Sequence, residues 1–100
     1  MITIIATYKL KKGVNMEDFI EFIKTKDIPL LNSFKEIDDF TVHLVEGPNK
    51  DVDIFEVVKA DSWKSWEKLS DKAEMKKHAQ LWSTFGDGDT VKIYYGKKIE

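Results

Sequence analysis

The sequence predicts an α+β domain of the ferredoxin-like type, in which helices cover a four-stranded antiparallel sheet. Segments with strand and helix patterns follow one another in the order βαββαβ, which is the split βαβ arrangement. A short loop of turn-forming residues separates the two middle strands, as in a hairpin. No linker, repeat or low-complexity stretch interrupts the 100 residues, so we expect residues 1–100 to form a single domain.

The first strand is expected over residues 2–10, which are rich in β-branched and aromatic side chains and end near Gly13. A helix then begins at Asn15, a residue type that often caps helices. Apolar residues follow at the spacing of one helical face, namely Met16, Phe19, Ile20 and Ile23. Pro29 should kink or restart this helix near Asp27, because proline lacks the N–H and disfavours helical geometry in the residue before it.

The second and third strands are expected over residues 40–45 and 52–58, and residues 47–51 form the loop between them. The last strand is expected over residues 90–95, which are again β-branched and aromatic. Strands two and three are therefore antiparallel neighbours.

The region 62–85 has a helical pattern that breaks once. Ser70 or Asp71 can begin a second helix there, and Asp71 with Glu74 has the spacing of a capping box. We therefore expect two helical pieces in this region.

Both faces of the predicted sheet are apolar. The first strand places Ile4 and Tyr8 on one face and Ile5 on the other, and the third strand places Val58 and Val57 on opposite faces. A sheet with one face in water should alternate apolar and polar residues instead. We therefore expect a homodimer in which two sheets pack face to face as a dimeric α+β barrel.

Composition argues against several classes of partner and site. The formal net charge of −2 supplies no electrostatic attraction to nucleic acid or anionic membranes, so neither is an expected partner. Without cysteine there is no disulfide or thiolate, and two isolated histidines suggest neither a metal site nor a cofactor site. The apolar start lacks the features of a signal peptide, so we expect a cytoplasmic protein.

Four strings of residues carry a resemblance to a known family. They are Tyr8-Lys-Leu-Lys-Lys-Gly-Val14, Asp27-Ile-Pro29, Phe55-Glu-Val-Val58 and Ser70-Asp-Lys-Ala-Glu-Met75. In this order they resemble the dimeric α+β barrel superfamily and, within it, the REDY-like family associated with prodigiosin-type pigment biosynthesis. The resemblance implies a homodimer with a cavity between helices and sheet for a small apolar ligand. It implies no mechanism, because the superfamily includes cofactor-free oxygenases, haem-degrading enzymes, isomerases and stress-related proteins.

His78 is the most informative single residue. It shares an apolar helical stripe with Met75, Ala79 and Trp82. There it would act as an acid or base, ligate iron, or simply be a hydrogen-bonded core residue. Haem-degrading members of the superfamily are similar in placing a tryptophan early and a histidine later, as Trp66 and His78 do. The polar strand-one amide of those enzymes has no counterpart in this sequence.

Aromatic residues offer flat surfaces for a ligand. Trp63, Trp66 and Trp82 would suit a pocket for a planar apolar molecule, although such residues also serve plain packing or a dimer interface. Tyr94 and Tyr95 alternate along the last strand, so one of them should reach the cavity.

His43 and Glu56 lie on neighbouring strands and would make an acid–base pair if they shared a face. If Val42 pairs with Glu56, however, His43 points to the opposite face. A carboxyl group in an apolar strand needs a partner, which is either a lysine or tyrosine of a second copy or a group of a catalytic site.

The sequence thus predicts a protein that binds or transforms a small apolar or aromatic molecule between sheet and helices. The expected lining is His78, Trp66, Trp82, Tyr94 or Tyr95, His43 and Glu56. The alternatives are a structural or stress-related dimer without catalysis, and a haem-binding or cofactor-free monooxygenase. A cavity of roughly 300 Å³ with converging polar groups favours ligand binding, whereas a space filled by the protein's own Trp and Phe side chains favours the structural role.

Overall fold

Four antiparallel strands form one sheet in the order β2-β3-β1-β4. They are β1 (Ile2–Tyr8), β2 (Ile37–Leu44), β3 (Ile54–Ala60) and β4 (Lys92–Gly96). The computed structural model describes residues 1–100. Its order of elements confirms the predicted α+β, ferredoxin-like βαββαβ fold.

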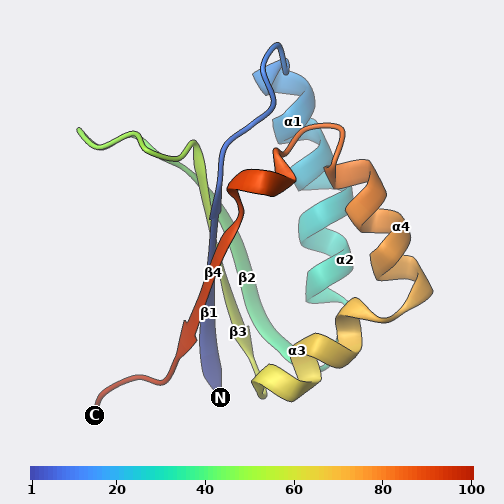
Figure 1. Ribbon diagram of the computed structural model, residues 1–100. Helices are drawn as coiled ribbons and strands as arrows, with labels where there is room; N and C mark the ends of the chain where they lie inside the picture. The colour runs from blue at the N-terminus through green and yellow to red at the C-terminus, as the bar shows by residue number, and fades with distance from the viewer.

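All helices lie on one side of this sheet, and the other side carries none (Figure 1). The first crossover contains α1 (Met16–Phe22), the π-helical segment η1 (Ile23–Asp27) and α2 (Ile28–Asn32). The second contains α3 (Trp63–Ser70) and α4 (Ala73–Trp82), followed by the 3₁₀ turn η2 (Gly88–Thr90) that leads into β4.

The first crossover restarts its α-helix directly after Asp27, as expected, but through a π-helical segment rather than a kink. Asn15 caps α1 as expected, since its side chain accepts a hydrogen bond from the Asp18 N–H at 3.2 Å. The chain then widens into a π turn, in which the Ile28 N–H bonds the Ile23 carbonyl, and continues as α2. Proline is tolerated because it lies at the start of α2, where its missing N–H costs little.

The second crossover forms two helices as expected, but the second helix begins without the expected capping box. Ser62 caps α3 by accepting from the Ser65 N–H at 3.1 Å. Asp71 ends α3, and Lys72 precedes α4 without a side-chain cap. The expected capping box of Asp71 and Glu74 is therefore wrong, because Asp71 retains helical backbone geometry as the C-cap of the preceding helix.

Several strand boundaries also differ from those predicted. β2 begins at Ile37 and includes an irregular register between Ile37 and Asp39, whereas β3 begins only at Ile54. Asp53 takes part in a turn contact instead, accepting the Leu10 N–H on its side chain at 2.8 Å. β4 begins after η2, so Thr90 lies outside the strand.

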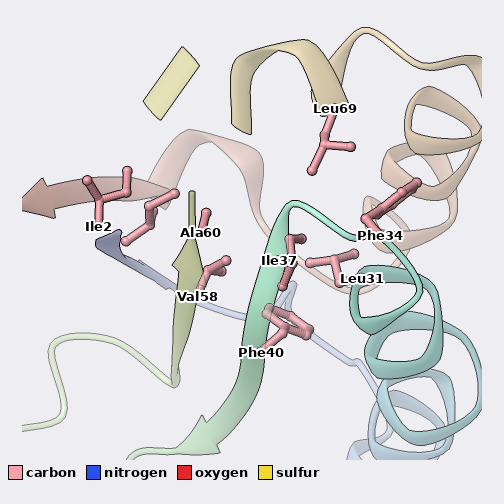
Figure 2. Packing of buried hydrophobic residues seen from close by; sticks show 9 residues of the cluster. Ile2, Leu31, Phe34, Ile37, Phe40, Val58, Ala60 and Leu69 are labelled. Atoms are coloured by element: carbon pink, nitrogen blue, oxygen red, sulfur yellow. The ribbon is translucent and has the colours of Figure 1, made fainter. Parts of the chain in front are cut away.

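The core consists of two groups of buried side chains between sheet and helices. Figure 2 shows the larger group, which includes Ile2, Leu31, Phe34, Ile37, Phe40, Val58, Ala60 and Leu69. The smaller group contains Tyr8, Phe19, Phe22, Ile23 and Ile54. Leu31 from the first group and Tyr8 from the second both border the cavity described below.

The uncovered face of the sheet carries a row of three apolar or aromatic residues and one threonine across all four strands. Thr41, Val57, Ile5 and Tyr94 lie opposite one another in successive strand pairs. Ile5 is 39% exposed and Tyr94 is 59% exposed, so large apolar side chains on this face are in contact with solvent. No helix of the chain has the length and apolar character needed to span a bilayer.

Candidate functional site

A cavity of about 290 Å³ lies between the sheet and the helices. Its apolar wall is formed by Ala6, Leu31, Trp66, Met75, Ala79, Trp82, Val91 and Ile93. Four polar residues also line it, namely Tyr8, Asp27, Glu56 and His78. The polar groups form two hydrogen-bonded pairs that converge on one apolar space.

The first pair joins η1 to α4. The His78 imidazole donates from Nε2 to Oδ1 of Asp27 over 2.6 Å. Both residues are buried, Asp27 at 4% and His78 at 9% exposure, and Phe22 stacks on the imidazole at 5.2 Å between ring centres. A neutral imidazole that donates from Nε2 keeps a lone pair on Nδ1, so this histidine is suited to accept a proton.

Asp27 and His78 are positioned by two different kinds of helix. Asp27 closes the π-helical segment, a wide turn that recurs at functional sites in proteins. His78 lies on the stripe of α4 that faces the sheet, as its spacing from Met75 and Trp82 predicted.

The second pair joins β1 to β3. The Tyr8 hydroxyl donates to Oε2 of Glu56 over 2.5 Å. Burial raises the pKa of Glu56 to about 7, with a further contribution from the nearby negative charge of Asp27, while the Tyr8 hydrogen bond opposes the rise. Burial and the charge of Glu56 also raise the pKa of Tyr8 well above its usual range. Tyr8 therefore stays protonated, and Glu56 exchanges its proton near neutral pH.

Trp66 and Trp82 form aromatic parts of the wall. The Trp82 ring meets the Tyr8 ring edge to face, with centres 4.9 Å apart. The indole also lies against buried Gly86, where an added Cβ would fall 2.1 Å from Cζ2 of Trp82. Only glycine at position 86 lets the indole take this place.

Four of the sequence-predicted residues meet in the cavity, namely Glu56, Trp66, His78 and Trp82. The expectation that Tyr94 or Tyr95 would line it is wrong. Tyr94 pairs with Ile5 on the uncovered face, and Tyr95 lies at the sheet edge, where it stacks on Trp63 at 4.2 Å and remains 56% exposed. Ile93 takes the position on β4 that borders the cavity.

His43 also lies away from this cavity. The hairpin pairs Val42 with Glu56, so His43 pairs with Phe55 and stacks on its ring at 4.6 Å. The acid–base pair of His43 and Glu56 is therefore absent, and the partner of Glu56 is Tyr8 of the same chain. His43 instead borders a separate cavity of about 580 Å³ near the free edge of β2.

Sequence reasoning missed Tyr8 and Asp27 as site residues. Asp27 lies four positions after Ile23 on the buried stripe of the first helix, where a lone acidic residue is a signal for a buried partner. Tyr8 lies on the same face as Ile4 in β1, and its spacing in the strand gives no sign that its hydroxyl bonds Glu56.

The site is equipped for proton transfer. His78 oriented by Asp27 has the arrangement of a general base, and Glu56 with Tyr8 offers a proton near neutral pH. No group of three or more His, Asp or Glu side chains in the structure is placed to hold a metal ion.

Comparisons with known proteins agree on one architecture. The family model for REDY-like protein HapK matches residues 2–99. The crystal structure of HapK from Hahella chejuensis is similar with a TM-score of 0.85 and 18% identity, over 99% of this chain and 93% of that one. No curated protein matches the sequence.

Two further solved structures share the fold. A dimeric protein of unknown function with a ferredoxin-like fold from Bacteroides fragilis has a TM-score of 0.73 and 14% identity, over 97% of this chain and 95% of that one. An antibiotic biosynthesis monooxygenase has a TM-score of 0.75 and 8% identity, with all of both chains covered. Identities this low establish a common fold and leave the chemistry open.

Proposed function

The chain belongs to the family of REDY-like protein HapK. We propose that it binds a small aromatic molecule in the 290 Å³ cavity and catalyses the removal of a proton from one position of this ligand and the addition of a proton at another. The observation that carries this proposal is the convergence of two pairs, His78–Asp27 and Tyr8–Glu56, on one apolar space. A cavity of this size is at the lower end of the range for small-molecule sites, roughly 300–1,000 Å³.

In this proposal His78 is the base. Its Nδ1 accepts a proton from the ligand, while Asp27 fixes the ring through Nε2 and stabilises the positive charge that develops. Glu56 returns a proton to the ligand, and Tyr8 donates a hydrogen bond that stabilises the Glu56 carboxylate left behind. Trp66 and Trp82 supply the apolar wall that excludes water and positions a flat molecule.

We also propose that two copies assemble through the uncovered sheet face. Val57, Ile5 and Tyr94 form the apolar row there, next to Thr41, and Ile5 and Tyr94 are exposed to solvent. Contiguous exposed apolar surface commonly marks an interface, and the similar protein from Bacteroides fragilis is described as dimeric. The dimer leaves the cavity on the opposite, helix-covered side of each sheet.

The alternatives receive less support. A purely structural dimer would fill the space with its own aromatic side chains, whereas four polar residues border this cavity. Haem would need cationic partners for its propionates, whereas this cavity is bordered by two carboxyl groups and no lysine.

The elimination of 5-nitrobenzisoxazole tests the proposal, because it needs only a base in an apolar cavity. The base takes the C3 proton, the ring N–O bond breaks, a nitrile forms and the oxygen leaves as a phenolate. We expect His78→Ala to lower the rate at least about 100-fold. Ala6→Phe, which fills the cavity, should also abolish turnover, while Ala73→Phe on the exposed start of α4 should not. Equal rates in wild type, His78→Ala and Ala6→Phe would overturn the proposal.

A further inference from the structure

One oxygen of the Asp27 carboxylate has no partner. Oδ1 accepts the His78 hydrogen bond, while Oδ2 is buried without any hydrogen bond. The Asp27 side chain is only 6% exposed, so bulk water does not solvate it freely. Buried acceptors are nearly always satisfied in native proteins. Because Asp27 also borders the cavity, an occupant of the cavity is the group available to supply this donor.

The charged residues that border the cavity disfavour a negatively charged ligand. Asp27 and Glu56 both border it, no lysine does, and the chain contains no arginine. The single imidazole, His78, is already paired with Asp27. An anionic ligand would therefore bring a third acidic group into an apolar space without a cationic partner, which is unfavourable.

Resting on the proposed function, we infer that the ligand is an aromatic molecule without negative charge, whose N–H or O–H group donates to Oδ2 of Asp27. Its ring lies in the apolar part of the cavity, which Trp66 and Trp82 help to form. The same carboxylate then orients the base through Oδ1 and the ligand through Oδ2, so that binding and proton transfer share one residue.

Matched ligand pairs test this inference on the wild-type protein. In 1-methylindole a methyl group replaces the N–H hydrogen of indole, and in anisole a methyl group replaces the O–H hydrogen of phenol, so each pair differs in its donor and by one methyl group. Calorimetric titration should show that the donor-bearing member of each pair binds about 10–150-fold more tightly, as expected for a hydrogen bond to a charged acceptor. Indole-3-carboxylate at neutral pH should bind more weakly than indole.

Asp27→Asn adds a test on the acceptor itself. The amide oxygen can keep the His78 hydrogen bond, which turns its NH₂ group toward the ligand. The preference for indole over 1-methylindole should then fall to about one or reverse. Asp38→Asn, on an exposed position of β2, should leave the wild-type ratio unchanged.

The outcomes separate the two proposals. Binding of both members of each pair with equal affinity, blocked by Ala6→Phe, would overturn the donor requirement and leave the cavity proposal standing. Tighter binding of indole-3-carboxylate than of indole would overturn the requirement for a ligand without negative charge. If no member of the panel binds, the proposed function fails and this inference fails with it. If Asp27→Asn does not fold, the wild-type ligand ratios still decide the question.

Discussion

The Asp27 carboxylate and the His78 imidazole meet across 2.6 Å although 51 residues separate them in the chain. The contact joins the π-helical segment of the first crossover to the last helix of the second. It couples the helices of the two crossovers on one side of the sheet, and both residues border the cavity.

Removing one member of this pair should destabilise the protein more than removing both. His78→Leu leaves a buried carboxylate without any partner and should cost about 3–5 kcal/mol in the free energy of unfolding. Asp27→Leu combined with His78→Leu should recover much of that loss, because no buried charge remains. Urea unfolding at one fixed protein concentration measures both. A double variant that is less stable than His78→Leu would contradict this account, in which the cost of burying the unpaired Asp27 charge causes most of the loss.

Glu56 should make the wild-type protein less stable as the pH rises. Its pKa in the folded state is about 7, against 4.5 for an ordinary glutamate. Between these values the folded protein holds a proton that the unfolded chain has released. Stability should therefore fall as the pH rises through this window and remain lower above it.

Glu56→Gln removes this titration and can still accept the Tyr8 hydroxyl. At about pH 8 the variant should exceed wild type in stability by about 3 kcal/mol, and at about pH 4 the two should be similar. Urea unfolding at both pH values checks the prediction. A stability difference that does not change with pH would show that Glu56 titrates normally.

Gly86→Ala should move Trp82 out of its place in the wall. The new Cβ would fall 2.1 Å from Cζ2 of the indole and cannot be accommodated without a shift. We expect a stability loss of about 1–3 kcal/mol and loss of the ring contact with Tyr8, visible in near-ultraviolet circular dichroism. Gly88→Ala is the matched control, since no atom lies within 4 Å of its added Cβ. Identical spectra for Gly86→Ala and wild type would show that Trp82 is placed otherwise.

Val57→Lys should dissociate the proposed dimer. Val57 lies in the middle of the apolar row on the uncovered sheet face, where a desolvated ammonium group is costly. Light scattering after size exclusion should give a dimer for wild type and a monomer for the variant. Leu81→Lys, on an exposed position of α4, should remain dimeric. A wild-type monomer at micromolar concentration would refute the assembly.

The fold followed from the sequence because hydrophobic periodicity and turn residues specify elements locally. The residues that line the cavity could be predicted only in part from the sequence. His78 was identified from its helical stripe, whereas its partner Asp27 lies on another crossover, and no local pattern indicates which acidic side chain turns inward. The positions of Tyr94 and Tyr95 depended on the register of β4 against β1, which sequence spacing does not fix.

A crystal structure of the protein soaked with indole tests the central claim most directly. The account predicts indole in the 290 Å³ cavity between sheet and helices, against Trp66 and Trp82, with its N–H directed at Oδ2 of Asp27. Indole seated instead in the 580 Å³ cavity near the free edge of β2, beside His43, would contradict the account.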